Sequence, residues 1–170
     1  MRRPVIGIVG AGDPSPESYA AALTLGRVIA ERGWIVLTGG RPLGVMAAAC
    51  AGAKQIPGSL TLGILPGASG GEGPDVDVAV FTAMGEARNA INVMSSDVVV
   101  ACGVEGPGTA SEVALALRAG KPVILLGASA EARSFFRKIG HWLEAASPKE
   151  AASLIEEELK ISRGPPWSTS

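Results

Sequence analysis

The chain has 170 residues, with 16 acidic and 15 basic side chains and a formal net charge of −1 at pH 7. This length suits one domain with one sizeable core. The near-zero charge and the low aromatic content of 4% argue against a nucleic-acid-binding protein, which would present a basic face or stacking aromatic side chains.

Short apolar runs alternate with helical patterns along nearly the whole chain. Six runs are apolar at successive positions, as strands covered on both faces must be. They span residues 4–10, 34–39, 60–66, 76–82, 97–103 and 122–127. Helical patterns span residues 16–32, 43–54, 85–95, 109–119, 130–139 and 148–160. The alternation predicts an α/β fold, a single Rossmann-like domain over residues 1–161 with a doubly wound parallel sheet of six or seven strands and helices on both faces.

The apolar runs, the cysteines and the C-terminal segment indicate where in the cell the protein is located and where its folded domain ends. No apolar run approaches the roughly 18 residues of a membrane-spanning helix, and the apolar run near the N-terminus breaks at Gly10, which favours a buried strand over a signal peptide. Cys50 and Cys102 are the only cysteines, and both lie in apolar surroundings. Buried free thiols fit a reducing compartment, so we expect a cytoplasmic protein without a membrane segment. Residues 162–170 lack periodicity and are expected to form a disordered tail.

Glycine-rich turns follow three of the predicted strands. They are "GAG" at 10–12, "TGGRPLG" at 38–44 and "GPGT" at 106–109. Ligands of parallel sheets bind beyond the carboxyl ends of the strands, and glycine lets the backbone approach a ligand closely and point N–H groups at it. A helix N-terminus adds unpaired N–H groups and the positive end of its dipole. Together the turns predict an anion site, and phosphate is the anion expected there.

Known nucleotide-binding motifs fit these turns poorly. Ser15 stands where the third glycine of a dinucleotide-binding G-x-G-x-x-G would be, and the second strand ends in Thr38-Gly39-Gly40 instead of an acidic residue for the ribose. No strand is followed by the G-K-[ST] of a P-loop. We therefore expect neither NAD nor ATP. Because His141 is the single histidine, we also expect no metal site and no histidine-based triad.

The charged side chains near the turns have two interpretations. Glu112 completes a capping box with Thr109 at a predicted helix start, but a carboxylate in the first turn would also face the anion site. Arg88 and Asn89 lie in a helical pattern, and Arg41 lies in the second turn. An arginine at such a position is either solvated or a phosphate ligand that binds through its planar guanidinium group.

Four segments of the sequence resemble the molybdenum cofactor carrier protein family. They are "TGGRPLGVMAAACAGAK", "LTLGILPG", "MGEARNAINVMSSDVVVA" and "GPGTASEVALALRAGKPVILLG". That family belongs to a Rossmann-like superfamily that also holds the LOG-type phosphoribohydrolases, often mislabelled lysine decarboxylases. The resemblance implies a homodimer or homotetramer that holds the molybdopterin form of the cofactor, protects it from oxidation and passes it to apo-molybdoenzymes.

The resemblance also implies where the cofactor binds. The terminal phosphate of molybdopterin would accept hydrogen bonds from the N–H groups of the "GPGT" turn. The residues expected to hold the cofactor are Gly10, Gly12, Thr38, Gly39, Gly40, Arg41, Gly44, Arg88, Asn89, Gly106, Pro107, Gly108, Thr109 and Glu112.

Two other functions stay open at this point. The hydrolase relatives carry the motif P-G-G-x-G-T-x-x-E, and the glutamate of this motif and an arginine upstream of it are their active residues. Arg88 and Glu112 would therefore be catalytic if this protein were such a hydrolase. The reaction would release the base and ribose 5-phosphate from a nucleoside 5′-monophosphate. Val104 and Glu105 replace the first proline and glycine of that motif, and Asn89 stands where a lysine usually follows the arginine. The third possibility is an oligomeric nucleotide sensor. For self-association we expect apolar helix faces that include Ile91, Val93, Met94, Val113, Leu115 and Leu117.

Overall fold

The structure is a computed structural model that describes residues 2–163, and its centre is a seven-stranded parallel sheet. Its strands are β1 (Val5–Val9), β2 (Ile35–Thr38), β3 (Leu60–Leu65), β4 (Val78–Phe81), β5 (Val98–Cys102), β6 (Val123–Leu126) and β7 (Leu143–Ala145). They pair in the order β4-β3-β2-β1-β5-β6-β7. The chain thus builds outward from β1 to β4 and then returns to the other side of β1 with β5, which confirms the predicted doubly wound α/β fold.

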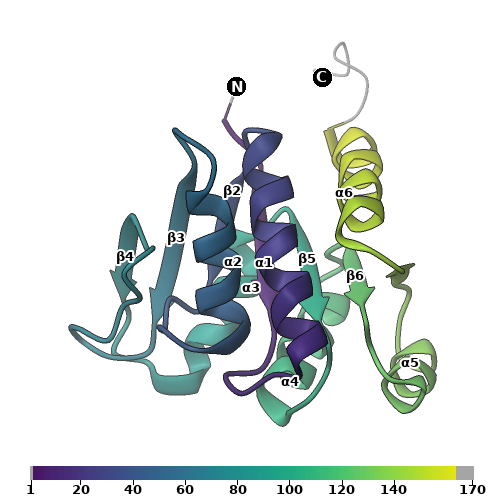
Figure 1. The fold of residues 1–170 in the computed structure, drawn as a ribbon. Coiled ribbons are helices and arrows are strands. Elements are labelled where there is room, and N and C mark those ends of the chain that lie inside the picture. Colours follow the sequence, from purple (N-terminus) through teal and green to yellow (C-terminus); the bar gives the residue numbers. More distant parts are fainter. Residues whose placement is uncertain (1, 164–170) are drawn as a thin grey trace, which may run out of the picture.

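Helices cover both faces of the sheet. On the face toward the viewer of Figure 1 lie α1 (Pro16–Glu31), α2 (Gly44–Lys54) and α6 (Pro148–Arg163). On the other face lie the 3₁₀ turn η1 (Gly85–Ala87) and the helices α3 (Arg88–Ser95), α4 (Pro107–Arg118) and α5 (Ala130–Arg137). Each layer has its own apolar cluster, because a parallel sheet must be buried on both faces.

Three features of the sheet and its ends differ from the sequence-based prediction or extend beyond it. The short strand β7 was not among the six apolar runs. Strand β4 was expected to be covered on both faces, but Val78, Val80 and Phe81 are exposed by 45%, 39% and 39% because β4 is an edge strand. Helix α6 continues through Arg163, and the rest of the predicted tail lies outside the described residues.

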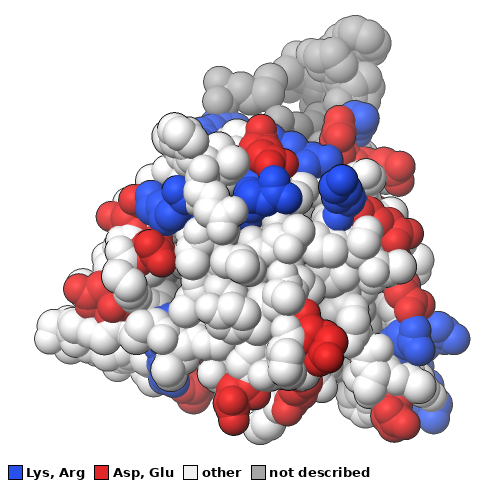
Figure 2. Space-filling view, in the orientation of Figure 1, with Lys and Arg blue, Asp and Glu red and all other residues white. Residues whose placement is uncertain are grey.

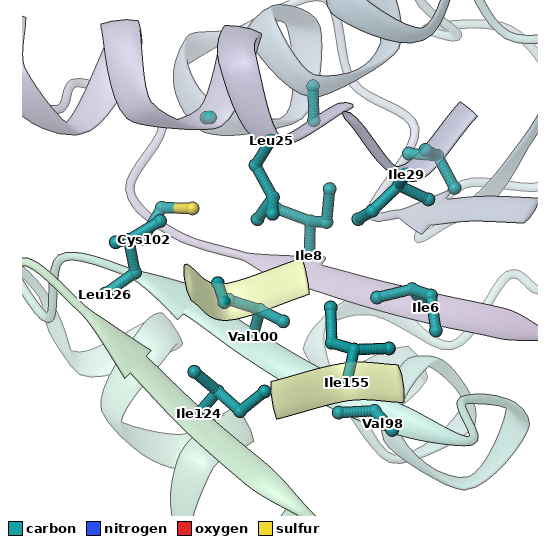
Figure 3. Packing of buried hydrophobic residues seen from close by; sticks show 14 of the residues in the cluster. Ile6, Ile8, Leu25, Ile29, Val98, Val100, Cys102, Ile124, Leu126 and Ile155 are labelled. Atoms are coloured by element: carbon teal, nitrogen blue, oxygen red, sulfur yellow. The ribbon is translucent and has the colours of Figure 1, made fainter. Parts of the chain in front are cut away.

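The larger core cluster fixes α1 and α2 over the centre of the sheet. Figure 3 shows Ile8 of β1 packed between Leu25 of α1 and Val100 of β5. The two helices cross so closely that a Cβ at Gly26 would lie 2.8 Å from the carbonyl carbon of Ala49. Only glycine permits that approach, and the crossing in turn fixes the position at which α2 begins. That position matters because the turn between β2 and α2 borders the cavity described below.

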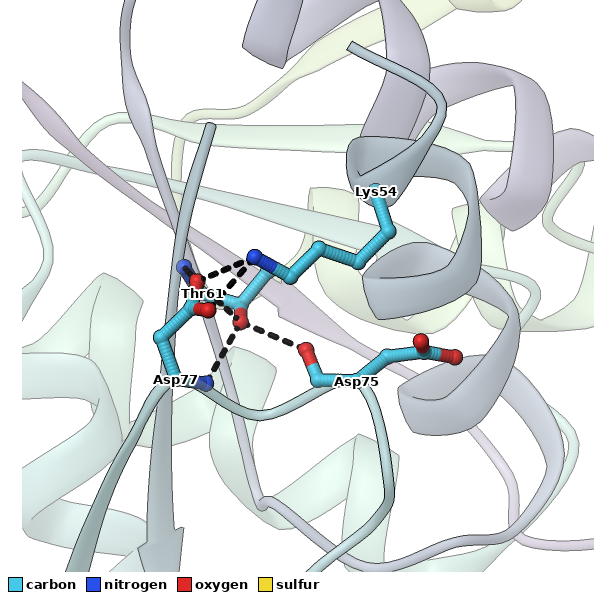
Figure 4. Close-up of polar contacts among 4 residues, drawn as sticks. All are labelled: Lys54, Thr61, Asp75 and Asp77. Atoms are coloured by element: carbon cyan, nitrogen blue, oxygen red, sulfur yellow. Dashed lines mark hydrogen bonds and ion pairs between the residues drawn. The ribbon is translucent and has the colours of Figure 1, made fainter. Parts of the chain in front are cut away.

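A polar cluster fixes the end of the segment between β3 and β4 (Figure 4). The Lys54 Nζ donates to both carboxylate oxygens of Asp77, at 2.5 and 2.6 Å, and the Thr61 Oγ1 donates to the carbonyl of Asp75 at 2.6 Å. Burial alone would raise the pKa of Asp77, but the hydrogen bonds from Lys54 and Thr61 prevail and lower it. Because Gly73 N–H also donates to the Gly40 carbonyl at 2.8 Å, this segment is held beside the turn after β2.

The structure also shows how charge is distributed on one face, whether any helix could cross a membrane, and the state of the two cysteines. Figure 2 shows that on the face formed by α1, α2 and α6 acidic and basic side chains are interspersed around an uncharged centre. No helix within residues 2–163 is long and apolar enough to cross a membrane. Cys50 and Cys102 are free and buried, as predicted.

Candidate functional site

A cavity of about 250 Å³ opens beyond the carboxyl ends of β1, β2 and β5, where the strand order changes direction. This is the position at which open α/β sheets bind ligands. Most of the residues expected to hold a ligand line it, and they come from four separate segments of the chain. They are Gly10, Gly12, Gly39, Arg41, Arg88, Asn89, Gly106, Pro107, Gly108, Thr109 and Glu112.

Three predicted site residues do not line the cavity and instead shape the turn behind it. The Thr38 Oγ1 is fully buried and accepts a hydrogen bond from Gly40 N–H at 3.0 Å. Gly40 has φ +73°, and a Cβ there would lie 2.9 Å from the Cα of Gly63. Gly44 has φ +49°, and its Cβ would lie 2.6 Å from the Gly12 carbonyl oxygen. Both glycines are needed for backbone geometry and close packing.

The N-terminus of α4 supplies hydrogen-bond donors to the cavity. The helix begins at Pro107, two residues earlier than predicted, with Gly106 as its N-cap. The N–H groups of Gly108 and Thr109 have no hydrogen-bond partner within residues 2–163, and the helix dipole places partial positive charge at this end. A Cβ at Gly106 or Gly108 would meet nothing within 4 Å, so a ligand can approach the backbone closely.

The capping-box interpretation of Glu112 is wrong. Because α4 starts at Pro107, Glu112 lies in the second turn, too far along the helix to reach back to the N-cap. Its Oε1 instead accepts a hydrogen bond from Asn92 Nδ2 of α3 at 2.9 Å, and only 7% of the residue is exposed. Burial raises the pKa of Glu112, while the Asn92 amide and the charge of Arg88 oppose that rise.

Arg88 is a buried cation in the cavity wall. It is the first residue of α3 and only 5% exposed. Its guanidinium lies beside Gly39, where an added Cβ would stand 2.9 Å from the Arg88 Cζ and 2.7 Å from the Met46 Sδ. The Nε has no hydrogen-bond partner, and no ion pair joins Arg88 to Glu112 within the described chain. Burial lowers the pKa of Arg88, against the nearby charge of Glu112. A buried charge of this kind is stabilised by an opposite charge, so an anion is the ligand that suits it.

Two charged side chains meet at the rim of the cavity. Arg41 Nη2 and Glu86 Oε1 are 3.2 Å apart, and both side chains are substantially exposed. Glu86 was not predicted, although it lies two residues before Arg88. The other lining residues that sequence reasoning missed are Ile8, Val9, Ala11, Leu43 and Met46. Apolar residues of this kind give no chemical signal in the sequence, and only their position next to the glycine-rich turns could have indicated them.

Glu105 was also missed, and it positions the loop before α4. Its carboxylate accepts hydrogen bonds from Ser15 N–H at 2.9 Å, Ser15 Oγ at 2.8 Å and Ser18 Oγ at 2.7 Å. Burial would raise the pKa of Glu105, but these serine hydrogen bonds prevail and lower it. The N-terminus of α1 therefore already has an acidic partner from within the chain. The N-terminus of α4 has no acidic partner in the part of the chain that the structure describes, which makes it the end that suits an external anion.

Known proteins share both this fold and much of this sequence. The molybdenum cofactor binding protein of Rippkaea orientalis is 45% identical over 94% of this chain and 99% of its own, with a TM-score of 0.91. The molybdenum cofactor carrier protein of Chlamydomonas reinhardtii is 46% identical over 93% of this chain and 99% of its own, with a TM-score of 0.87. An uncharacterized protein of Archaeoglobus fulgidus is 42% identical over 126 residues, which cover 74% of this chain and 82% of that protein.

These similarities confirm the resemblance that the four sequence segments indicated. Residues 3–152 match the SLOG cluster4 family. Since that match covers most of the 170 residues, the chain belongs to the SLOG cluster4 family.

Proposed function

We propose that this protein binds molybdenum cofactor in the cavity, protects it from oxidation and delivers it to apo-molybdoenzymes. One observation carries the proposal: the N-terminus of α4 and the buried Arg88, both without a partner among residues 2–163, line the same cavity. Both groups suit a phosphate-bearing ligand. The similarity to molybdenum cofactor carriers at 45% and 46% identity supports the choice of ligand.

The residues present fit the chemistry of this cargo. The N–H groups of Gly108 and Thr109 would donate to the phosphate, and Arg88 would neutralise part of its charge. Leu43 and Met46 add apolar wall, against which a flat heterocycle would pack. A cargo bound against several segments of chain would be shielded on that side from solvent and from dissolved oxidants.

The phosphate site is tested by filling the space in front of the α4 N-terminus. Gly108 has no left-handed φ and an open approach, so Gly108→Val should block the ligand without straining the backbone. The purified protein should retain molybdopterin through gel filtration and slow its oxidative loss, and Gly108→Val should do neither. Thr109→Ala should be milder, because the Thr109 N–H remains. Unimpaired binding by Gly108→Val, or binding by the wild type no tighter than by an unrelated protein of similar charge, would refute the proposal.

The role of Arg88 is tested with paired ligands. Arg88→Ala should weaken a phosphorylated ligand far more than its dephosphorylated form, because the charge-assisted hydrogen bond is lost only in the first case. Equal losses for both ligands would mean that Arg88 only shapes the cavity.

The hydrolase hypothesis is tested with the same protein. We expect AMP and N6-isopentenyl AMP to stay intact on incubation, as judged by chromatography of the free base. Turnover that disappears in Glu112→Gln would replace the carrier proposal, because Arg88 and Glu112 do line one cavity. The nucleotide-sensor hypothesis is tested by thermal shift, since a specific ligand raises the melting temperature.

We further propose that the protein is a cytoplasmic homo-oligomer. Val93 and Val113, which were expected to serve self-association, are instead buried in the core of the chain. Met94 and Leu115 remain 60% and 36% exposed and line an apolar groove between α3 and α4. A second copy packed there would bury this groove. Light scattering that shows only monomer at micromolar concentration would contradict the proposal.

A further inference from the structure

Asn92 lies directly behind the cavity wall and is held in a fixed position. It is one turn after Arg88 on α3 and only 1% exposed. The Ser96 Oγ donates to the Asn92 carbonyl at 2.7 Å. Ser96 in turn fills the space beside Gly7 of β1, where an added Cβ would lie 3.1 Å from the Ser96 Cβ. The backbone that carries Asn92 is therefore docked tightly on the central strand of the sheet.

Two buried polar atoms on this turn of α3 have no hydrogen-bond partner within the described chain, Arg88 Nε and Asn92 Oδ1. One is a donor and the other an acceptor, and residues four apart on a helix are neighbours on its surface. Unpaired buried polar groups are rare and costly. An apolar residue in place of Asn92 would avoid that cost, so efficient packing does not explain the amide.

The contact that does explain it is with Glu112. The Asn92 Nδ2 is the hydrogen-bond donor that the structure gives the Glu112 carboxylate, at 2.9 Å, while Arg88 makes no ion pair with it within residues 2–163. The other charged groups near Glu112 are Arg88 on α3 and Glu86 on η1, and Glu86 is paired with Arg41 of the turn after β2. A hydrogen-bond donor favours the charged form of a carboxyl group, whereas burial disfavours it.

We propose that Asn92 is a positioning residue of the site: its amide holds Glu112 as a carboxylate beside the anion cavity, so an anionic ligand binds with uptake of one proton by Glu112 and is released as the pH rises. The inference rests on the proposed function only in placing an anion in this cavity. When the proton enters the Glu112 carboxyl group, one negative charge facing the ligand is removed. Asn92 thereby sets the pH at which the cavity changes from retaining an anion to repelling it.

Sulfate is the probe, because it stays a dianion over the pH range in which a buried carboxyl group titrates, whereas a phosphate monoester has its own titration near pH 6. Calorimetric titration of the wild-type protein should show sulfate affinity falling several-fold as the pH rises through one midpoint. Glu112→Gln should abolish that pH response. Asn92→Leu removes the amide donor at similar volume and should move the midpoint upward by about one to two pH units, the shift expected from loss of a hydrogen bond to a charged group.

Companion variants separate this role from a purely structural one. If Asn92→Leu does not fold, Asn92→Ala removes the donor without adding a titratable group and should also move the midpoint upward. The double variant Asn92→Leu with Glu112→Gln should show the same flat profile as Glu112→Gln alone. A wild-type affinity that does not change with pH, or a midpoint that stays in place in the folded Asn92 variant, would overturn the inference.

Retention of molybdopterin is measured separately at a single pH, so that the two proposals can fail independently. A shifted sulfate midpoint in a protein that does not retain molybdopterin would support the role of Asn92 and contradict the carrier function. An unshifted midpoint in a protein that does retain molybdopterin would overturn the role of Asn92 alone.

Discussion

Replacement of Gly39 by alanine should weaken phosphate-bearing ligands by displacing the guanidinium group of Arg88 from the cavity wall. An added Cβ would stand 2.9 Å from the Arg88 Cζ and 2.7 Å from the Met46 Sδ, closer than such atoms pack in proteins. Gly39 has no left-handed φ, so the backbone accepts alanine. Both obstructing atoms belong to flexible side chains, and the guanidinium group of Arg88 must move away from its place in the cavity wall.

The expected loss follows from the charge-assisted hydrogen bond that a displaced Arg88 can no longer make. Hydrogen bonds to charged groups contribute about 1.5–3 kcal/mol, which corresponds to a loss of about tenfold to a hundredfold in affinity. Overpacking costs about 1–3 kcal/mol of stability, and we expect the lower end because side-chain ends can give way. The loss should affect a phosphorylated ligand and spare its dephosphorylated form.

The assay is calorimetric titration of both ligands against Gly39→Ala, with thermal unfolding to follow stability. Gly67→Ala is the matched control, because an added Cβ there meets its nearest atoms at 3.6 Å, an ordinary contact distance, and the residue lies outside the cavity lining. The control should bind as the wild type does. If Gly39→Ala binds the phosphorylated ligand as tightly as the wild type, Arg88 does not act from the position seen in this structure and the reasoning is refuted.

Further predictions concern the loop before α4, the thiols and self-association. Glu105→Ala leaves Ser18 and the α1 N-terminus without their acidic partner, so the melting temperature and ligand affinity should both fall; affinity that stays unchanged would show that the loop needs no such anchor. Burial raises the pKa of Cys50 to about 11 and of Cys102 to about 12, so neither thiol should react with iodoacetamide in the folded protein at pH 8, as judged by mass spectrometry. These pKa values lie above the unfolded value of about 8.5. The stability that the thiols contribute is therefore complete below about pH 8.5 and is lost as the pH rises toward 11 and 12. Urea unfolding at increasing pH should show this loss of stability, and the loss should be smaller in Cys→Ala variants. Met94→Lys places a charge in the α3–α4 groove and should yield monomers by light scattering, whereas an unchanged mass would place the interface elsewhere.

The sequence by itself determined the α/β class, the parallel sheet and the edge at which to look for a ligand. Apolar runs separated by helical patterns leave few other folds, and the carboxyl ends of parallel strands always meet at one edge. It also indicated most of the polar lining, since Arg88 and the "GPGT" turn carry recognisable anion-binding chemistry. It did not reveal the exposure of β4, because a strand at the edge and a strand in the centre have the same apolar pattern.

Only the tertiary structure decided how the side chains around the cavity are paired. From the sequence, Glu112 had a local partner within its own helix. The fold instead brings Asn92 of α3 to the Glu112 carboxylate. It also makes Glu105, 87 residues from Ser18 in the chain, the acidic partner of the α1 N-terminus. Local patterns such as a capping box predict contacts between near neighbours in the chain. The contacts that set charge in a buried site depend on how separate elements pack, and that packing is settled by the whole core.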